Sequence, residues 1–331
     1  MRFLLPLAGL GLVLGSAANA APEKMRAVEV APDGTLSVQT RPVPKPAAGE
    51  VLIRVRAAGV NPVDWKVAQR RIGLVPGTDV AGTIDTLGEG VAGFAVGDAV
   101  VGWARQSGSY AEYAVVPVNS LAKKSKALSF EQAAGVPIAA ETAYRSLHES
   151  VKVQKGQTVL IQGAAGGVGS AAVQIAKAAG AKVIGTASPN NHEFLKSLGA
   201  DQLIDYRTQR FEDVVKNVDV VINTVDAQTA TRSIAVLREG GTLVSAAGGA
   251  NPAACAAAKV VCTRPTRETG ASNAEVLQKV MELADAGKFK VNVEEAFAME
   301  DTAKAWAKSR AGHTRGKLVI KVSGGPTMKH Q

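Results

Sequence analysis

A glycine-rich segment at residues 163–169, with the sequence GAAGGVG, limits what this 331-residue chain can fold into. An apolar run precedes it and an alanine-rich run follows it, which predicts a strand, a tight turn and a helix. Glycine at 166 lets a bound group approach the backbone, and glycine at 169 lets the helix pack closely on the strand. The first amides of the helix are free to bind phosphate. The turn therefore predicts a dinucleotide site made by Ala165, Gly166, Gly167, Val168 and Gly169; the alternative is a tight turn that only packs on a sheet.

From residue 157 onwards, on both sides of this turn, short apolar runs alternate with longer runs of helical pattern. The short runs predict strands at 158–162, 182–186, 202–204, 218–223, 242–246 and 259–263, and the longer ones predict helices at 168–179, 191–198, 210–216, 228–237 and 273–286. Strands separated by helices of this length form βαβ units with a parallel sheet. The sequence therefore predicts an α/β fold with a doubly wound parallel sheet of the Rossmann type.

The region between residue 24 and the alternating part carries a different pattern. Short runs at 25–30, 36–41, 50–60, 80–87, 99–103 and 110–116 are separated by Gly, Pro and Asp. Many short strands between turn residues are typical of a barrel-like β domain. Ser129 then predicts the N-cap of a helix that resumes and reaches residue 148. The end of the chain predicts a strand at 291–293, a helix near 302–309 and a strand at 317–322.

The end of the second Rossmann strand indicates which dinucleotide the turn binds. Chains that bind NAD place an Asp or Glu about 20 residues after the glycine turn, where it holds the ribose 2′-hydroxyl. Residues 186–192 contain no acid, and a carboxylate there would repel a 2′-phosphate. Ser188, Asn191 and His192 can donate hydrogen bonds to such a phosphate, which favours NADPH over NADH. Ser188 could also cap the next helix.

The first 20 residues have the pattern of a secretory signal peptide. Arg2 is a short positive region, residues 3–15 are almost wholly apolar, and residues 18–20 (ANA) form a small-residue cleavage site. The apolar run is too short to span a bilayer. We therefore expect a periplasmic or secreted protein without stable membrane insertion. The alternative is that Met25 is the true start and the protein is cytoplasmic.

The two cysteines and the basic charge balance bear on compartment and partners. Cys255 and Cys262 would be free in a reducing cytoplasm, whereas export would permit a disulfide across this short loop. The formal net charge is +9, but the 38 Lys and Arg are scattered. A nucleic-acid surface needs clustered basic and aromatic residues. We therefore expect no nucleic-acid partner and interpret the charge as solvated surface.

Several short motifs together carry a family resemblance from about residue 25 to 322. They lie at 57–64 (AAGVNPVD), 76–82 (PGTDVAG), 96–98 (VGD), 142–144 (TAY), 163–169, 204–206 (IDY), 263–265 (TRP) and 316–320 (GKLVI). On these motifs the chain resembles the zinc-free branch of the medium-chain dehydrogenase/reductase superfamily, and within it the NADPH:quinone oxidoreductases of the zeta-crystallin type.

The resemblance implies a chaperonin-10-like (GroES-like) β-barrel catalytic domain at 25–127 and 288–322. It implies a Rossmann NADPH-binding domain at 128–287, with the cofactor in the cleft between the two, and we expect a flexible tail at 323–331. It also implies that the protein is a homodimer.

The resemblance further implies a reaction without metal. Zinc-dependent relatives place a Cys ligand at or near position 61 and Gly-His-Glu at positions 77–79, where this chain has Asn and Gly-Thr-Asp. Alcohol oxidation is disfavoured without a Lewis acid to stabilise an alkoxide. We therefore expect hydride transfer to a small electron-poor acceptor, a quinone or an α,β-unsaturated carbonyl. The alternatives are an enoyl-thioester reductase and a dinucleotide-binding protein with little catalysis.

The resemblance places Asn61, Lys66 and Thr142 near the nicotinamide or the substrate, with catalysis mostly by positioning. Lys66 stands where many relatives carry Tyr and could instead be an ordinary solvated lysine. Asn61 could be only a turn former. Trp103 could wall the substrate cleft or belong to the core.

Further cofactor contacts are expected at the carboxyl ends of the Rossmann strands, where ligands bind. Tyr206, Thr224 and Gly248 occupy these positions in the sequence, and the resemblance places Tyr206 on the adenine-ribose side. It also implies that Arg310 reaches a cofactor phosphate. The alternative for Arg310 is a charge that stabilises a helix C-terminus.

Overall fold

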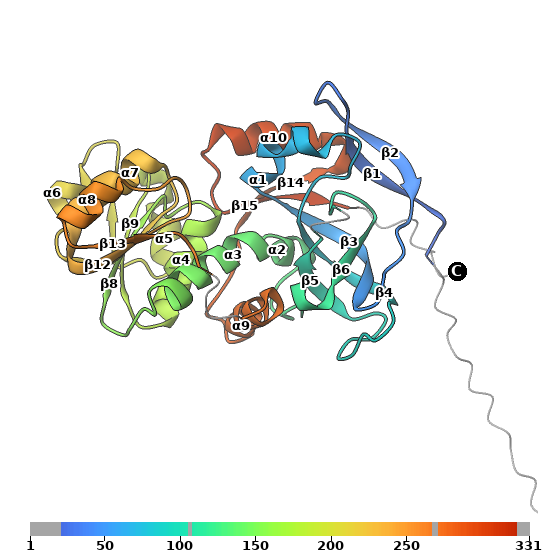
Figure 1. Ribbon diagram of the computed structural model, residues 1–331, viewed down its shortest axis with the longest axis horizontal. Helices are drawn as coiled ribbons and strands as arrows, with labels where there is room; N and C mark the ends of the chain where they lie inside the picture. Colours follow the sequence, from blue (N-terminus) through green and yellow to red (C-terminus); the bar gives the residue numbers. More distant parts are fainter. Residues whose placement is uncertain (1–20, 105–107, 267–270, 323–331) are drawn as a thin grey trace, which may run out of the picture.

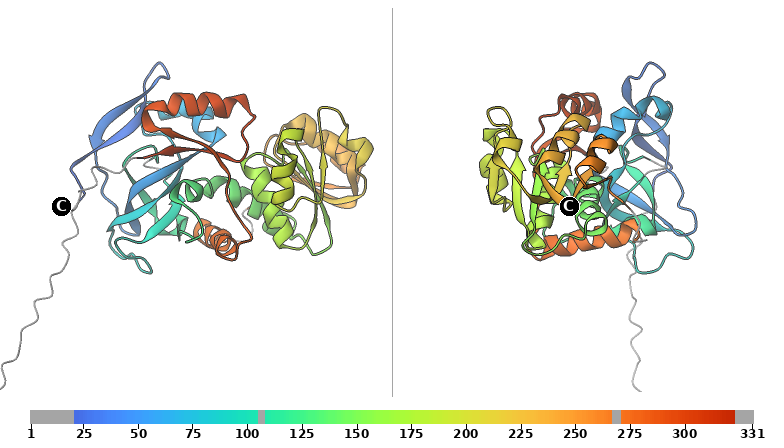
Figure 2. Two further views of the ribbon diagram at one scale, coloured as in Figure 1. Left: turned by 180° about the vertical axis from the view of Figure 1, so that it is seen from behind. Right: turned by 60° about the vertical axis from the view of Figure 1, so that its left-hand side comes forward.

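A computed structural model describes residues 21–104, 108–266 and 271–322 of the chain. The expected signal peptide at 1–20 and tail at 323–331 lie outside these residues. The described chain forms an α/β part and a β-rich part that lie side by side, with helices α3 (Pro137–Tyr144) and α9 (Asn273–Asp285) between them (Figures 1 and 2).

The α/β part is built on a six-stranded parallel sheet. Its strands are β8 (Thr158–Gln162), β9 (Lys182–Thr186), β10 (Gln202–Ile204), β11 (Val218–Asn223), β12 (Leu237–Ser245) and β13 (Val261–Thr263). They lie in the order β10-β9-β8-β11-β12-β13, which is the strand order of a doubly wound Rossmann sheet. The predicted fold class is therefore confirmed. The order reverses between β8 and β11, and a crevice opens at such a reversal.

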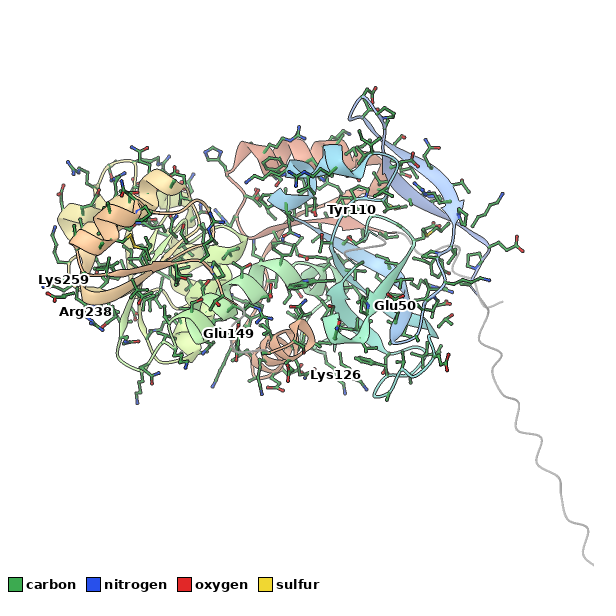
Figure 3. All side chains as sticks on the ribbon, in the orientation of Figure 1. Glu50, Tyr110, Lys126, Glu149, Arg238 and Lys259 are labelled. Carbon is green, nitrogen blue, oxygen red and sulfur yellow. A yellow bond between two sulfur atoms is a disulfide. The ribbon has the colours of Figure 1, made fainter. Side chains whose placement is uncertain are left out.

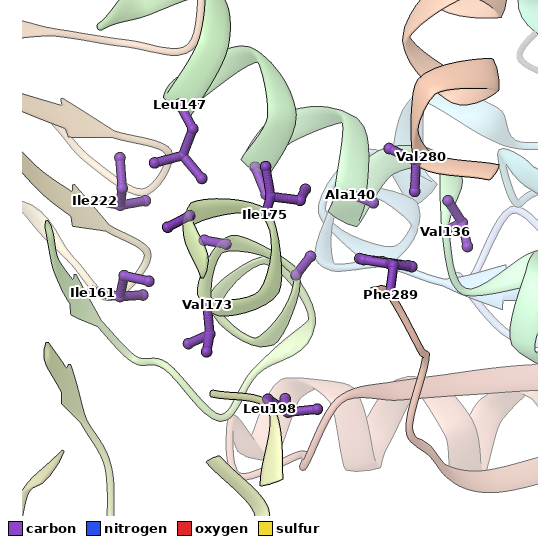
Figure 4. Packing of buried hydrophobic residues seen from close by; sticks show 14 of the residues in the cluster. Val136, Ala140, Leu147, Ile161, Val173, Ile175, Leu198, Ile222, Val280 and Phe289 are labelled. Carbon is purple, nitrogen blue, oxygen red and sulfur yellow. The ribbon is translucent and has the colours of Figure 1, made fainter. Parts of the chain in front are cut away.

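Helices cover both faces of this sheet. They are α4 (Gly167–Ala178), α5 (His192–Ser197), α6 (Phe211–Val214), α7 (Ala227–Ser233), α8 (Pro252–Ala257), and the short 3-10 segments Pro189–Asn191 and Ile234–Val236. On one face, Ile161 of β8 and Ile222 of β11 belong to the same buried cluster as Val173 and Ile175 of α4 (Figure 4). Each such side chain contributes roughly 1.5–3 kcal/mol by burial. This packing fixes α4, and with it the glycine turn, against the sheet.

The β-rich part contains strands from both ends of the chain. Its strands are β1 (Lys24–Val30), β2 (Leu36–Pro42), β3 (Glu50–Val60), β4 (Asp79–Leu87), β5 (Ala99–Trp103), β6 (Tyr113–Pro117), β7 (Leu121–Lys123), β14 (Val293–Ala298) and β15 (Lys317–Lys321). β1 pairs with β2, and the remaining strands form a sheet in the order β14-β15-β3-β4-β5-β7, with β6 also on β3. β15 runs antiparallel to β3 with Leu318 opposite Val60. The C-terminal segment thus returns to complete the first sheet.

Short helices connect these strands and join the two parts. They are α1 (Pro62–Lys66), α2 (Phe130–Ala134), α3, α10 (Thr302–Ala311), a π-helical segment Arg145–Ser150, and the 3-10 segments Ala68–Arg71, Val118–Ser120 and Met299–Asp301. Ser129 caps α2 as predicted, because its side chain accepts a hydrogen bond from the amide of Gln132.

Several predicted elements differ from the observed ones. The strand predicted at 110–116 starts at Tyr113 and the one at 291–293 is observed as Val293–Ala298. The helix predicted at 228–237 ends early because Leu237 is drawn into β12 opposite Val218. Helix α8 was not predicted at all. It is a short alanine run that depends on a local cap, since the Asn251 side chain accepts from the amides of Ala253 and Ala254.

Cys255 of α8 and Cys262 of β13 are joined by a disulfide, with their Cα atoms 6.2 Å apart. The bond ties the short helix to the last strand of the sheet. Among the described residues, no helix has both the length and the apolar composition needed to cross a membrane.

Candidate functional site

The glycine turn has the geometry that a pyrophosphate site requires. Gly163 adopts a left-handed φ of 70°, and a Cβ added at Gly169 would lie 2.2 Å from the Gly163 carbonyl oxygen. A side chain at 169 would therefore push α4 away from β8. At Gly166 the nearest atom to an added Cβ is 3.6 Å away, so the protein leaves space there. Gly166 is the N-cap of α4 and has no side-chain cap, so the first amides of the helix are free to bind an anion.

A cavity of about 280 Å³ opens at this turn, at the point where the strand order reverses. Thr224, directly after β11, lies on its wall, and its hydroxyl donates to the carbonyl of Gln162 at 2.8 Å. The other wall comes from the β-rich part, including Asn61 and Lys317. The residues that line the cavity are Val60, Asn61, Pro62, Ile138, Ala139, Gly166, Gly167, Val168, Thr224, Ser309, Gly312, Thr314, Gly316, Lys317 and Leu318. The backbone cradle and the cleft together fit a dinucleotide.

The end of β9 gathers polar groups from two distant parts of the chain. The side-chain Nδ2 of Asn191 donates to the Ser188 hydroxyl at 3.2 Å, and His192 Nε2 lies 3.2 Å from the carbonyl oxygen of Ala187. Arg315, from the C-terminal segment, donates from Nε to Asn191 Oδ1 at 2.6 Å and from Nη2 to the Asn190 carbonyl at 2.7 Å. The Arg315 guanidinium therefore lies at the end of β9, a position for which the sequence had indicated only that no acidic residue is present.

A buried polar cluster surrounds Asn61 at the cleft. Asn61 is 2% exposed, and its side-chain Nδ2 donates to Asp79 Oδ2 at 2.9 Å. Its Oδ1 accepts a hydrogen bond from Lys317 Nζ, which also donates to the Val60 carbonyl at 2.9 Å. The backbone amide of Asn61 donates to Asp64 Oδ2 at 2.8 Å. The first two contacts hold the asparagine side chain at both ends of its amide, and the third holds its backbone.

Burial sets the protonation of this cluster. It raises the pKa of Asp79 to about 7, although the charge of Lys317 and the hydrogen bond from Asn61 act in the opposite direction. Burial also lowers the pKa of Lys317, against the charges of Asp79 and Asp64. Tyr110 donates its hydroxyl to Asp64 Oδ2 at 2.8 Å, and burial and that carboxylate raise its pKa well above the ordinary value. The cluster holds ionisable groups in a dry environment beside the cleft.

A second cavity of about 330 Å³ is lined by Asp64 of this cluster. Its walls combine apolar side chains with a few polar groups: Val63, Asp64, Val67, Pro76, Gly77, Thr78 and Ile138. Ile138 lines both this cavity and the one at the glycine turn. A small apolar molecule with one polar atom fits such a lining.

The other candidates from the sequence lie in several different places. Tyr206 and Gly248 follow β10 and β12, at the same sheet edge as Thr224, and Tyr206 is 54% exposed. Thr142 is half-buried on α3, one turn beyond the cavity-lining Ile138, and its carbonyl accepts from Ser146. Trp103 is 1% exposed and belongs to the core.

Lys66 and Arg310 lie together on the outside of the cleft. Lys66 is exposed with Nζ 5.3 Å from the ring centre of Trp65, and Arg310 lies over the same ring at 5.4 Å. Trp65 itself donates to the Ser309 hydroxyl at 3.1 Å. Neither Lys66 nor Arg310 is among the residues that line the two cavities, so their placement gives no support to the predicted roles.

Sequence reasoning missed Lys317, Asp79 and Arg315 as site residues. Asp79 and Lys317 each lie within a family motif, but the residues around them do not indicate that the two side chains meet at Asn61. Arg315 lies 124 positions from Asn191. The only local signal was a basic pair around a glycine at the start of the last strand. These residues meet because β15 pairs with β3 and its first residues cross the glycine turn, where the Gly316 amide donates to the Ala165 carbonyl at 2.8 Å.

A divalent metal does not fit the residues at Asn61. A cation between Asn61 and Asp79 would face the ammonium of Lys317, which already occupies Asn61 Oδ1. In the described part of the chain, no group of three or more His, Cys, Asp or Glu could hold a metal ion.

Comparison with known proteins gives matches over both parts. Residues 47–126 match the alcohol dehydrogenase GroES-like domain and residues 198–320 match the zinc-binding dehydrogenase family; residues 139–240 match the C-terminal domain of alanine dehydrogenase/PNT. The 2-methylene-furan-3-one reductase of Solanum lycopersicum is 37% identical over 300 residues, which cover 84% of this chain and 73% of that protein. The NADPH-dependent alkenal/one oxidoreductase of Arabidopsis thaliana is 35% identical, over 84% and 73%.

A solved structure agrees with these matches. The quinone oxidoreductase from Coxiella burnetii superposes with a TM-score of 0.79 at 31% identity, over 91% of this chain and all of that one. A Rossmann sheet with a dinucleotide turn, joined across a cleft to a GroES-like domain, defines a dinucleotide-dependent oxidoreductase. The chain belongs to the medium-chain dehydrogenase/reductase superfamily.

Proposed function

We propose that this protein is a zinc-independent, NADPH-dependent reductase of quinones and α,β-unsaturated carbonyl compounds. The observation that carries the proposal is the cleft, in which one cavity is lined by both the glycine turn and Asn61 and a second, largely apolar cavity adjoins it through Ile138. The names of its relatives support this reading, since a furanone reductase, an alkenal/one oxidoreductase and a quinone oxidoreductase all act on conjugated carbonyl compounds.

The residues of the cleft supply binding and orientation. Bound NADPH would supply the hydride. The amides at the start of α4 would hold its pyrophosphate. Asn61 Nδ2 has a second N–H besides the one given to Asp79, and this donor can bind the carbonyl oxygen of the acceptor. Val63, Val67 and Ile138 give the second cavity an apolar lining, which excludes water from the reacting atoms.

Arg315 supports NADPH rather than NADH as the physiological donor. Its Nε and Nη2 are held by Asn191 and Asn190, and its Nη1 has no acceptor among the described residues. A guanidinium anchored on one edge presents the other edge to a 2′-phosphate. Ser188, Asn191 and His192 lie in the same turn and complete the proposed phosphate site.

Independence from zinc is supported by the Asn61 cluster, in which the amide oxygen accepts a hydrogen bond from Lys317 and is not free to bind a metal ion. The test is to measure zinc by elemental analysis and to repeat turnover after treatment with a chelator. We expect less than stoichiometric zinc and unchanged turnover; loss of activity that added zinc restores would contradict the proposal.

The reductase activity is tested with purified protein and NADPH. The oxidation of NADPH is followed by absorbance with 1,4-quinones, alkenals, enones and an enoyl thioester, and alcohols with NADP⁺ serve as the opposing control. We expect turnover with quinones or enones and none with simple alcohols. Tight NADPH binding without reduction of any acceptor would show instead a binding protein with little catalysis, and a preference for the thioester would favour an enoyl-thioester reductase.

Two further proposals concern the state of the protein in the cell. The disulfide between Cys255 and Cys262 supports export to an oxidising compartment. N-terminal sequencing of protein from fractionated cells distinguishes a start at Ala21 outside the cytoplasm from a start at Met25 within it.

A homodimer is the second of these proposals. In the part of the chain that the structure describes, β13 is the edge strand of the Rossmann sheet and pairs with β12 alone. Val261 on this strand is 55% exposed, and an open edge of this kind is suited to pairing. Light scattering on a sizing column measures the mass directly, and a mass of one chain would contradict the proposal.

A further inference from the structure

Lys317 connects the glycine turn to the Asn61 side chain. Its stem crosses the turn so closely that a Cβ added at Gly167 would lie 2.9 Å from Lys317 Cδ. Its ammonium reaches the end of β3, where Nζ donates to the Val60 carbonyl and to Asn61 Oδ1. The residue is 6% exposed although it carries a charge. Burying a lysine is costly, so its contacts must be satisfied, and both of its acceptors lie at the cleft.

Asp79 holds the other end of the same amide. It is fully buried on β4, and its Oδ2 accepts from Asn61 Nδ2 at 2.9 Å. The amide of Ile138 on α3 also points at this carboxyl, at 3.2 Å from Oδ1. An ammonium at the oxygen and a carboxylate at the nitrogen leave the amide only one orientation. The described residues offer no acceptor for the second N–H of Nδ2, and Asn61 lines the cavity.

We propose that Lys317 and Asp79 are positioning residues that lock the Asn61 carboxamide with its nitrogen as the hydrogen-bond donor in the cleft. This inference rests on the proposed reductase function, in which Asn61 touches the acceptor. Loss of either partner frees the amide to rotate, and in half of its orientations it presents an oxygen to the acceptor carbonyl, which it repels. Lys317 also ties this orientation to the turn that holds the dinucleotide.

The arrangement depends on the charge of Asp79. A carboxylate accepts a strong hydrogen bond from Asn61, whereas the protonated carboxyl accepts a weaker one and can compete as a donor. The titratable groups that face Asp79 are Lys317 from β15, Asp64 from α1 and Tyr110 from the segment before β6. Burial brings the pKa of Asp79 to about 7, so the lock should weaken as the pH falls through that value.

The first test is kinetic and uses size-matched variants. Lys317→Met keeps the stem on the turn and removes the charge, and Asp79→Asn keeps the shape and removes the carboxylate. We expect kcat to fall roughly tenfold to hundredfold, as for other small misplacements of catalytic groups, while the KM for NADPH changes by less than about threefold. The matched controls are Lys321→Met on β15, whose lysine is exposed, and Asp85→Asn on β4, whose carboxylate pairs with Arg54; both should keep wild-type kinetics.

The pH profile separates positioning from a merely structural role. Wild-type kcat/KM for the acceptor should rise with pH through a midpoint near 7, and this rise should be absent in Asp79→Asn and preserved in Asp85→Asn. An unchanged kcat in both Lys317→Met and Asp79→Asn, or the same rise in Asp79→Asn as in wild type, overturns the proposal.

A second measurement does not depend on activity. In the cofactor-free protein, the side-chain amide signals of Asn61 are followed by ¹⁵N–¹H NMR and assigned with Asn61→Ala. These signals should titrate with a midpoint near 7, shift in Lys317→Met and lose their titration in Asp79→Asn. If the wild type reduces no acceptor but these shifts are observed, the proposed reaction fails and the lock stands. Signals that neither titrate nor respond to Lys317→Met overturn the lock, whatever the activity. This outcome is measured on the wild type and Lys317→Met alone, so the test remains valid if Asp79→Asn does not fold.

Discussion

Replacing Arg315 with alanine should convert a selective NADPH site into one that binds both nicotinamide dinucleotides alike. Hydrogen bonds to a charged group contribute roughly 1.5–3 kcal/mol. Arg315 is half-exposed, so solvent screening places its contribution at the lower end, about 1.5–2 kcal/mol. Because each 1.4 kcal/mol is a factor of ten, the KM for NADPH should rise roughly 10- to 30-fold. NADH has no 2′-phosphate, so its KM should change by less than about twofold.

The assay measures initial rates with both dinucleotides at a fixed quinone concentration, in low and in physiological salt. Arg310→Ala is the matched control, since Arg310 carries the same charge but lies over Trp65 outside the cavity. We expect only a small, unselective change in that variant. Equal losses for NADPH and NADH in Arg315→Ala would show that Arg315 merely supports the turn at Asn190. A selective loss in Arg310→Ala alone would move the phosphate site to α10 and refute the reasoning.

Three other predictions test the turn, the disulfide and the buried acid. Gly166→Ala should keep the melting temperature and lose NADPH affinity. Gly169→Ala, whose Cβ would lie 2.2 Å from a backbone oxygen, should lose NADPH affinity and also about 1–3 kcal/mol of stability. Thermal unfolding measures the stability, and fluorescence titration measures the NADPH affinity. Reducing the bond between Cys255 and Cys262 should cost about 2–3 kcal/mol in urea unfolding, and a double Ser variant should be equally weakened and insensitive to reductant. The pKa of Asp79 is raised to about 7, so the folded state binds more protons than the unfolded state between about pH 4 and pH 7. The contribution of Asp79 to the free energy of unfolding therefore decreases as the pH rises through that window. Urea titrations at the two ends of the window should show a smaller change in the free energy of unfolding for Asp79→Asn than for wild type, and an equal change in both proteins would contradict this.

Local sequence was sufficient for the parts of the site that are made by backbone. The turn at 163–169 needs a strand, glycines and a helix start, and all three are encoded within about 20 consecutive residues. The strands β3, β5, β8, β9, β10 and β11 match their predicted ranges because each is a short apolar run bounded by turn residues. Elements that depend on a partner were placed less well. Leu237 follows a helical pattern, but pairing with β11 makes it extended, and α8 depends on the Asn251 cap and the disulfide.

By itself, the sequence determined the fold class, the dinucleotide turn and the lack of an acid after β9, since each follows from residues that are close together in the chain. Only the tertiary structure decided which side chains act there. Arg315 meets Asn191, and Lys317 and Asp79 meet Asn61, because the C-terminal strand β15 pairs with β3 and passes over the glycine turn. Pairing between strands that are hundreds of residues apart leaves no trace in the local pattern of either strand. The charge state of Asp79 is likewise a result of burial, which exists only once the two parts of the molecule have closed around it.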